Sequence, residues 1–424
     1  MRLLLVHIKD LSMIERFTLP NGLRVIAEPL PHLRSVSIGV WVRAGSILES
    51  PDQNGWSHFI EHMAFKGTER RTAKQISQEI DAVGGYLNAA TSKLCTTYYA
   101  KVIDEDLPLA VDMLADIVIH PVLAEKELDK ERFVVLEEIG MTDDSPEDVA
   151  YDLISSALFG TQPLGQTILG PRENIERCTR ADLSAFRSRY YTPQNACVAV
   201  AGNYDSKHLH ELLLQHFGSW EGGSCAEYPV EKTNANPATL TKDKDVEQVH
   251  LCLGWSSCPL GDNDVYAVAT FNSILGGSSS SRLFQRIREE SGMAYTVYSA
   301  PAFYPHCGDL TVYAAVSPKN VKTVLEQIDD EIGRLLHDGI SEEEYRMTKA
   351  QLKGGFILGQ ESAYHRMNGL GSNLALLDRF IPAEETICSI EAVTYEDVMH
   401  VAKRILSAER SQAFVGKKIE KLIK

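Results

Sequence analysis

The sequence has no apolar run approaching the roughly 18 residues that a membrane span requires. Residues 1–10 carry too short an apolar run for a secretory signal, and they lack the Arg-rich, Ser-rich, acid-poor composition of a mitochondrial presequence. Basic residues are scarce: 42 Lys and Arg stand against 58 Asp and Glu, giving a net charge of −16. Such a surface repels phosphate backbones, so we expect no nucleic-acid partner. The lack of a long apolar run leads us to expect no membrane partner either. The charge suits cationic peptide substrates, although acidity also simply keeps many bacterial proteins soluble.

The eight cysteines contain no Cys-x-x-Cys pair and no regular framework. In a chain of this length they predict buried, reduced thiols rather than disulfides. The remaining composition, 44% hydrophobic and 24% charged, is that of an ordinary soluble globular protein. We therefore expect a cytoplasmic protein.

His58, Glu61 and His62 form the most informative pattern, in a stretch that predicts one short helix over 54–66. Two histidines four positions apart lie on one helical face, where two imidazoles can share a tetrahedral zinc ion. Glu61 projects near the same edge and is placed to deprotonate water. The order His-x-x-Glu-His is the inverzincin signature. The alternative is a surface helix with two solvated histidines, so the zinc interpretation requires a third ligand.

Glu138, on a helix predicted over 124–143, is the candidate third ligand. It has apolar neighbours, among which an unpaired carboxylate is costly, and a nearby cation removes that cost. Glu131 lies seven positions earlier and shares the same face of the helix. The alternative is a stripe of solvated glutamates, as on most acidic helices.

Together, His58, Glu61, His62 and Glu138 resemble the pitrilysin/insulinase family of zinc peptidases, family M16. The subgroup that the chain most resembles contains mitochondrial processing peptidase and its homodimeric bacterial relatives, and the resemblance to the latter implies a bacterial origin. The resemblance implies one zinc ion per chain held by His58, His62 and Glu138, with Glu61 as the general base and Glu131 as a residue that orients the site. Further similar segments lie at 19–23, 41–46, 131–139, 162–165 and 170–175.

Two further segments match substrate-contacting parts of the family. Arg288 and Tyr295 resemble a pair that the family places opposite the zinc; both side chains are suitable donors to a carbonyl that becomes an oxyanion. Asn88 and Ala89 resemble an edge strand on which the peptide docks as an added strand. The alternatives are a solvated Arg288 with a packing Tyr295, and an edge that is covered or merely polar.

Chain length and an internal repeat predict two domains. The 424 residues are too many for one core and suit two domains of about 200 residues each. The second half echoes the first at an offset of about 214 residues, with Trp255 matching Trp41. At that offset no zinc ligand has an equivalent that could replace it, so we expect the second domain to share the fold without the metal.

We divide the chain into an N-terminal tail (1–13), a zinc-bearing domain (14–218), a linker rich in Gly, Ser, Pro, Asn and Lys (219–245), and a second domain (246–424). The predicted fold class is α+β, with two homologous domains like those of LuxS/M16 metallohydrolases. Each is expected to be an antiparallel-rich sheet with helices packed on one face. Besides a strand at 36–42, helices are predicted at 54–66, 73–83, 106–119, 124–143, 147–159 and 181–190.

We predict a zinc-dependent endopeptidase that hydrolyses oligopeptides or unfolded segments inside a dimeric chamber. The chain is half the length of the family's single-chain members, so the resemblance implies a homodimer with sites completed in trans; a heterodimer with a related chain is the other arrangement. A rival hypothesis is a non-catalytic scaffold or partner subunit, like family members that have lost zinc, but here the motif is intact. A third hypothesis is a metal-binding protein without turnover. The presence of Glu61, which is not a ligand, argues against it.

Overall fold

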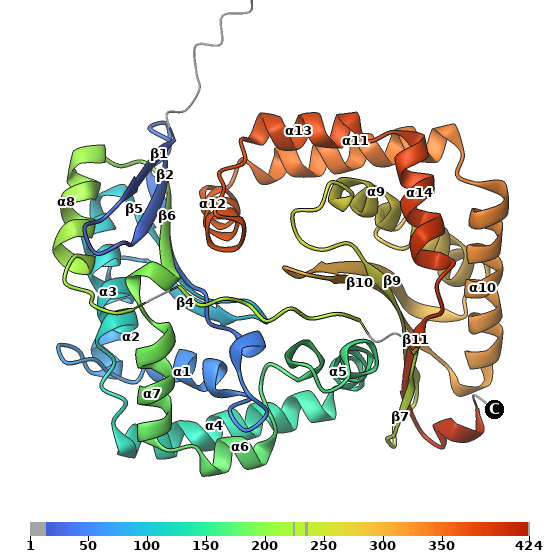
Figure 1. Cartoon of the computed structure of the whole chain (residues 1–424), viewed down its shortest axis with the longest axis horizontal. Helices are drawn as coiled ribbons and strands as arrows, with labels where there is room; N and C mark the ends of the chain where they lie inside the picture. Colours follow the sequence, from blue (N-terminus) through green and yellow to red (C-terminus); the bar gives the residue numbers. More distant parts are fainter. Residues whose placement is uncertain (1–13, 224, 234–235, 423–424) are drawn as a thin grey trace, which may run out of the picture.

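The computed structural model describes residues 14–223, 225–233 and 236–422, which form two halves, each built around one β-sheet (Figure 1). The predicted tail, residues 1–13, lies outside the described residues. Two sheets with packed helices confirm the predicted α+β class. Among the described residues, no helix is both long and apolar enough to cross a bilayer.

The first half contains a six-stranded sheet in the order β1-β2-β6-β3-β5-β4. All neighbouring strands are antiparallel except β2 and β6, which are parallel. Strand β4 lies at the edge of the sheet, as predicted for the segment that contains Asn88 and Ala89. The strands are β1 (Glu15–Thr18), β2 (Arg24–Pro29), β3 (Ser35–Val42), β4 (Tyr86–Thr91), β5 (Thr96–Ile103) and β6 (Ala196–Gly202).

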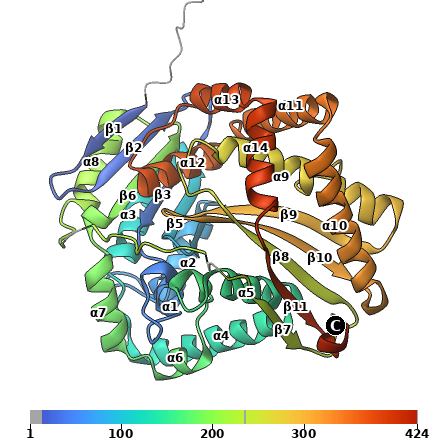
Figure 2. The same ribbon diagram turned by 45° about the vertical axis from the view of Figure 1, so that its right-hand side comes forward.

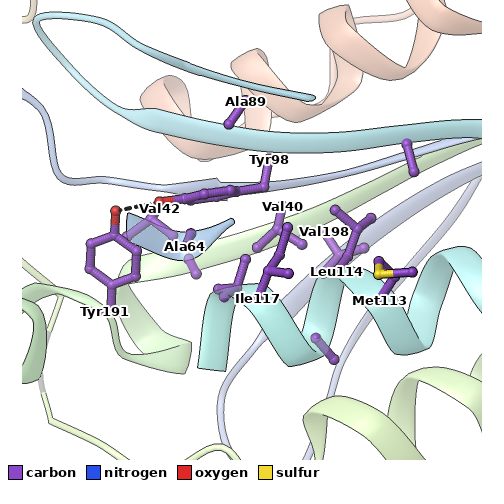
Figure 3. Packing of buried hydrophobic residues seen from close by; sticks show 14 of the residues in the cluster. Val40, Val42, Ala64, Ala89, Tyr98, Met113, Leu114, Ile117, Tyr191 and Val198 are labelled. Atoms are coloured by element: carbon purple, nitrogen blue, oxygen red, sulfur yellow. Dashed lines mark hydrogen bonds between the residues drawn. The ribbon is translucent and has the colours of Figure 1, made fainter. Parts of the chain in front are cut away.

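The helices of the first half, apart from the one at Pro146–Phe159, cover one face of this sheet. All six predicted helices are present, and α6 and α8 are additional. Val40 and Val198 of the sheet share a buried core with Met113, Leu114 and Ile117 of α3 (Figure 3). The helices are α1 (Trp56–Ala64), α2 (Ala73–Ala82), α3 (Leu107–Ile119), α4 (Glu125–Asp144), α5 (Pro146–Phe159), α6 (Arg172–Arg177), α7 (Arg180–Tyr190) and α8 (Ser206–Phe217).

The second half contains a five-stranded sheet in the order β7-β11-β8-β10-β9. The predicted end of the linker at residue 245 is wrong. Strand β7 lies inside the range 219–245 and pairs in parallel with β11, so the second sheet begins before residue 246. Its polar, mostly exposed sequence does not carry the alternation that marks a strand. The rest of the domain division stays a prediction. The strands are β7 (Thr239–Asp243), β8 (Val249–Ser257), β9 (Ala294–Phe303), β10 (Gly308–Val316) and β11 (Ser411–Gly416).

The second half has a hydrophobic core of its own, formed by its sheet and most of its helices. The Gly/Ser loop 276–281 lies between α9 and a short π-helix, Phe284–Glu290, which carries Arg288. The helices are α9 (Val265–Leu275), α10 (Val321–Asp338), α11 (Glu342–Gly359), α12 (Ala363–Leu377), α13 (Ala383–Ala392) and α14 (Tyr395–Leu406).

One helix from each half packs on the sheet of the other half. Helix α12 lies on the first sheet, where Met367 and Leu374 join a buried cluster with residues of β2, β3 and β6 (Figures 1 and 2). Helix α5 lies on the second sheet, where Ile154 and Leu158 join a cluster with residues of β8, β10 and β11. The prediction that helices pack on one face of each sheet therefore holds only for each half's own helices. The opposite face of each sheet is covered by the helix from the other half.

Trp41 and Trp255 are not equivalent, contrary to the predicted repeat. Trp41 points toward α12, where a Cβ on Gly371 would lie 2.3 Å from its ring. Trp255 points into the core of its own half. Aligning β11 with β6 at the predicted offset places Gly254 at the position of Trp41. A difference of one residue exchanges the two faces of a strand, so the indole rings point in opposite directions.

All eight cysteines are free thiols. Most are buried, as predicted, but Cys225 and Cys388 are exposed. The prediction of uniformly buried thiols is wrong at these two positions, because spacing along the chain carries no information about exposure.

Candidate active site

Helix α1, which carries the His-x-x-Glu-His motif, is fixed at its start by the buried carboxylate of Glu49. That carboxylate accepts hydrogen bonds from the backbone N–H groups of Gly55 (2.8 Å) and Ser57 (2.6 Å). It thereby satisfies donors that the first turn of a helix leaves unpaired. Burial raises the pKa of Glu49, although these hydrogen bonds oppose the change. Gly55 has a φ of 99°, and a Cβ there would lie 2.4 Å from the carbonyl oxygen of Leu169, so glycine is required at the turn into α1.

His58, His62 and Glu138 converge between α1 and α4, as predicted. The two Nε2 atoms are 3.2 Å apart, and Oε2 of Glu138 lies 3.7 Å from that of His58 and 3.3 Å from that of His62. A tetrahedral zinc ion with ligands at about 2.1 Å has ligand–ligand distances of roughly 3.3 to 3.4 Å, so the three separations fit one ion. Within the described residues, no other group of His, Cys, Asp and Glu has such spacing, and none lies in the second half.

The two histidines differ in their tendency to hold a proton. Burial, together with the neighbouring His62, lowers the pKa of His58 to about 3. At His62 burial also opposes protonation, but the hydrogen bond to Glu131 and the charges of Glu138, Glu131 and Glu61 outweigh burial and raise its pKa. Metal ligation requires a neutral imidazole, and a bound cation would supply the positive charge that these carboxylates favour.

Glu131 lies behind His62, on the side away from the convergence point. Its two oxygens lie 2.9 Å from Nδ1 of His62 and 2.7 Å from Nζ of Lys66. These contacts outweigh the burial of Glu131 and lower its pKa. A carboxylate at Nδ1 fixes the tautomer and orientation of the ring, which leaves Nε2 toward Glu138. His58 has no such support, because its buried Nδ1 has no hydrogen-bond partner among the described residues.

Glu61 lines a cavity together with His58 and Glu138 but does not belong to the ligand group. Its Oε2 accepts a hydrogen bond from the Thr91 hydroxyl at 2.5 Å. Burial raises the pKa of Glu61, while the Thr91 hydrogen bond and His62 oppose the increase. A carboxylate held by one hydroxyl beside the ligand group can accept and return a proton. Sequence analysis did not identify Thr91, because nothing in its local pattern indicates that β4 passes next to α1.

The cavity has a volume of about 480 Å³ and lies between α1, α4, α5, β4 and residues 167–169. Asp148 and Asp152 of α5 line it, with Lys93 as a cation. Burial raises the pKa of Asp152 to about 6, and Lys93 opposes the increase. Together with Glu61 and Glu138, these residues make the lining predominantly acidic. Neither aspartate nor Lys93 belongs to a recognised motif, so sequence analysis did not identify them.

Strand β4 borders the cavity as a sheet edge, the position predicted for peptide docking. The side chain of Ala89 is buried in the core of the first half (Figure 3), and docking of a peptide on its backbone stays a prediction. Asn88 is exposed and donates a hydrogen bond of 2.7 Å to the Tyr86 hydroxyl, but it does not line the cavity. Ala90 and Thr91 line it instead. Successive side chains of a strand point to opposite faces, which separates Ala89 from Ala90.

Arg288 and Tyr295 lie together, as predicted, but away from the metal group. The Arg288 guanidinium donates to the Tyr295 carbonyl and lies 4.3 Å from the centre of its ring. Tyr295 is 74% exposed, so the alternative of a packing residue is wrong. The pair lines a cavity of about 340 Å³ beside the Gly/Ser loop, and this cavity shares no residue with the one at the metal group. A single chain therefore brings Arg288 to Tyr295 but not to the metal ligands.

Two family models match the chain. Insulinase (Peptidase family M16) matches residues 24–172, and the Peptidase M16 inactive domain matches residues 177–352. The chain belongs to peptidase family M16. The first match contains the whole metal group of this M16 protein, and the second contains none of it.

Relatives of this M16 protein match over nearly its full length. The uncharacterized zinc protease YmxG of Bacillus subtilis (strain 168) is 40% identical over 404 residues, 95% of this chain and 98% of that protein. An uncharacterized zinc protease of Mycobacterium tuberculosis (strain ATCC 25618 / H37Rv) is 42% identical over 405 residues, 95% of this chain and 92% of its own.

Solved structures also share the fold of this M16 protein. A protease from Helicobacter pylori matches with a TM-score of 0.90 and 25% identity, over 96% of this chain and all of that chain. A Pseudomonas fluorescens structure described as a peptidase M16 inactive domain matches with a TM-score of 0.87 and 20% identity, over 96% of this chain and 98% of its own. At that identity the second match supports the fold alone.

Proposed function

We propose that this M16 protein is a zinc-dependent endopeptidase that hydrolyses oligopeptides or unfolded polypeptide segments. The observation that carries the proposal is the convergence of His58, His62 and Glu138 at tetrahedral spacing. Glu61 lines the same cavity as His58 and Glu138. Three protein ligands leave one coordination position open, which is typical of catalytic rather than structural zinc sites. The relatives named zinc proteases support this chemistry at the level of the family.

In the proposed mechanism, Glu61 acts as the general base and then as the general acid. When bound, zinc would polarise the peptide carbonyl and make water more acidic. Glu61 accepts the proton of the attacking water and delivers it to the leaving amine. Burial raises the pKa of Glu61, which makes its carboxylate a stronger base for the first transfer. The Thr91 hydroxyl orients the carboxylate, and Glu131 orients His62.

The cavity and its border favour substrates that carry positive charge and have an extended backbone. Asp148 and Asp152 favour a substrate with a positive side chain near the scissile bond. The free edge of β4 can hydrogen-bond an added peptide strand regardless of its side chains. An unfolded segment can adopt that extended shape, whereas a folded domain cannot.

We propose that the active enzyme is a homodimer in which Arg288 and Tyr295 of one subunit complete the zinc site of the other. In support, Tyr295 is exposed, and the pair does not share a cavity with the metal group of its own chain. A two-fold arrangement would give two equivalent sites. A heterodimer with a related chain would use the same contacts. The relatives described above are bacterial, and we propose a cytoplasmic location.

The alternative function is a non-catalytic scaffold or partner subunit. It would need neither a base nor a complete ligand set, yet this chain has a complete ligand set and, in the cavity that His58 and Glu138 line, the carboxylate of Glu61. The deciding experiment is digestion of a mixed peptide library by the zinc-loaded protein, read by mass spectrometry, with Glu61→Gln as the control. Zinc-dependent cleavage absent from the control supports the peptidase. Equal cleavage by both proteins, or none by either, would contradict it.

A further inference from the structure

Lys93 lies beside the candidate active site but has no part in the mechanism above. It occupies the turn between β4 and β5, and its Nζ donates a hydrogen bond to the backbone carbonyl of Gln166. The next residues, Thr167, Ile168 and Leu169, line the same cavity as Lys93. One ammonium group therefore connects the turn after β4 to the opposite cavity wall, which we define as residues 166–169.

The far end of this wall is fixed by other contacts. The Asn54 side chain donates to the carbonyl of Thr167 at 2.7 Å, and the Thr167 hydroxyl accepts from the N–H of Gly170 at 2.9 Å. A Cβ on Gly170 would lie 2.1 Å from the carbonyl oxygen of Asn54, so the chain runs close to the start of α1. At the near end, the side-chain oxygen of Gln166 has no partner among the described residues. The near end of the wall therefore depends on Lys93 more than the far end does.

The charge of Lys93 is balanced by carboxylates from both halves of the chain. Burial has the largest effect on Lys93 and lowers its pKa. Four carboxylates favour its charged form: Asp152 of α5, Glu49 before α1, Glu231 between the two sheets in the sequence, and Asp309 of β10. Glu49, Glu231 and Asp309 are at most 7% exposed. None of the four forms a contact ion pair with Lys93 in the described part of the chain, so they act on it over longer distances. Buried carboxylates are costly without a cation nearby, which explains a lysine here.

We propose that Lys93 is a positioning residue that holds wall 166–169 at the distance from β4 that admits a substrate side chain. It acts through the Gln166 carbonyl and not on the reacting atoms. Its consequence for substrate rests on the proposed peptidase function. The anchoring of the wall is a property of the free protein and is tested separately.

The anchoring is tested by hydrogen–deuterium exchange of the full chain, read on peptides that cover residues 164–170. In Lys93→Met the exchange of this segment should rise about tenfold, because one charge-assisted hydrogen bond is lost. Lys93→Arg should stay near the wild type, since a guanidinium can donate to the same carbonyl. Lys322→Met, at an exposed position of α10, is the matched control. If Lys93→Met does not fold, Lys93→Gln is measured instead. Unchanged exchange in the variant that is measured overturns the inference.

The consequence for substrate is tested by peptide cleavage at equal zinc content. Lys93→Met should raise KM about tenfold and change kcat by less than about threefold, and Lys93→Arg should restore most of the loss. A fall in kcat at constant KM would overturn the inference, because Lys93 would then act on bond cleavage. If the wild type cleaves nothing, the proposed function fails. Binding of an unfolded peptide to Lys93→Met, compared with the wild type, then decides the role of Lys93: about tenfold weaker binding supports it, and equal binding refutes it.

Discussion

Nδ1 of His62 lies 2.9 Å from Oε1 of Glu131, and this contact determines which ring nitrogen faces the candidate metal position. Glu131→Ala should therefore weaken zinc binding about 10- to 100-fold without removing a ligand. Competition against a chelator of known affinity measures the change. Glu137→Ala, at an exposed position of α4, is the matched control. Wild-type affinity in Glu131→Ala would show that packing alone orients His62.

Loss of any ligand should abolish stoichiometric zinc. His58→Ala, His62→Ala and Glu138→Ala should each retain far less than one zinc per chain after dialysis, measured by elemental analysis. His400→Ala, at an exposed position of α14, should remain loaded. Chelation with 1,10-phenanthroline should stop peptide cleavage by the wild type, and added zinc should restore it. Full zinc affinity in Glu138→Ala would make the third-ligand assignment wrong.

Glu61→Gln should keep its zinc and lose turnover. Removing a general base typically costs about 10² to 10⁴ in rate, while the ligands stay in place. Thr91→Val removes only the hydroxyl that orients Glu61, so its kcat should fall by a smaller factor. Steady-state kinetics with zinc content measured on the same samples tests both variants. Near-normal kcat in Glu61→Gln would refute the mechanism and leave the metal site intact.

Completion of the site in trans predicts complementation between inactive chains. Glu61→Gln and Tyr295→Phe should each be nearly inactive alone, yet equal amounts should recover activity on mixing. Random pairing makes about half of the dimers mixed, and each mixed dimer carries one intact site. Subunit exchange is verified by mass spectrometry of differently tagged chains. No recovery after verified exchange would mean that Tyr295 acts in cis or not at all.

The packing of α12 on the first sheet predicts opposite effects for two glycines on that helix. Gly371→Ala places a Cβ 2.3 Å from Trp41 and should lower the free energy of unfolding by about 1–3 kcal/mol. Gly369→Ala meets nothing within 4 Å and should raise it by up to about 1 kcal/mol, because alanine favours a helix. Urea denaturation compares the two variants. Equal effects would show that α12 does not rest on Trp41.

By itself the sequence determined the elements that depend on local periodicity. The four-residue spacing of His58 and His62 places both rings on one face of any helix they form, wherever that helix packs. The same reasoning places Glu131 and Glu138 on one face of α4. The six predicted helices are confirmed for this reason, whereas the edge position of β4, also confirmed, was expected from the family resemblance.

Only the tertiary structure decided which segments meet, because contacts between distant parts of the chain depend on register and packing. A shift of one residue turns a side chain from one face of a strand to the other, which separates Trp255 from Trp41 and Ala89 from Ala90. The hydrogen bond from Thr91 to Glu61 exists because β4 passes beside α1. The hydrogen bond from Lys93 to Gln166 joins segments with no common sequence pattern, so no reading of either segment alone could reveal it.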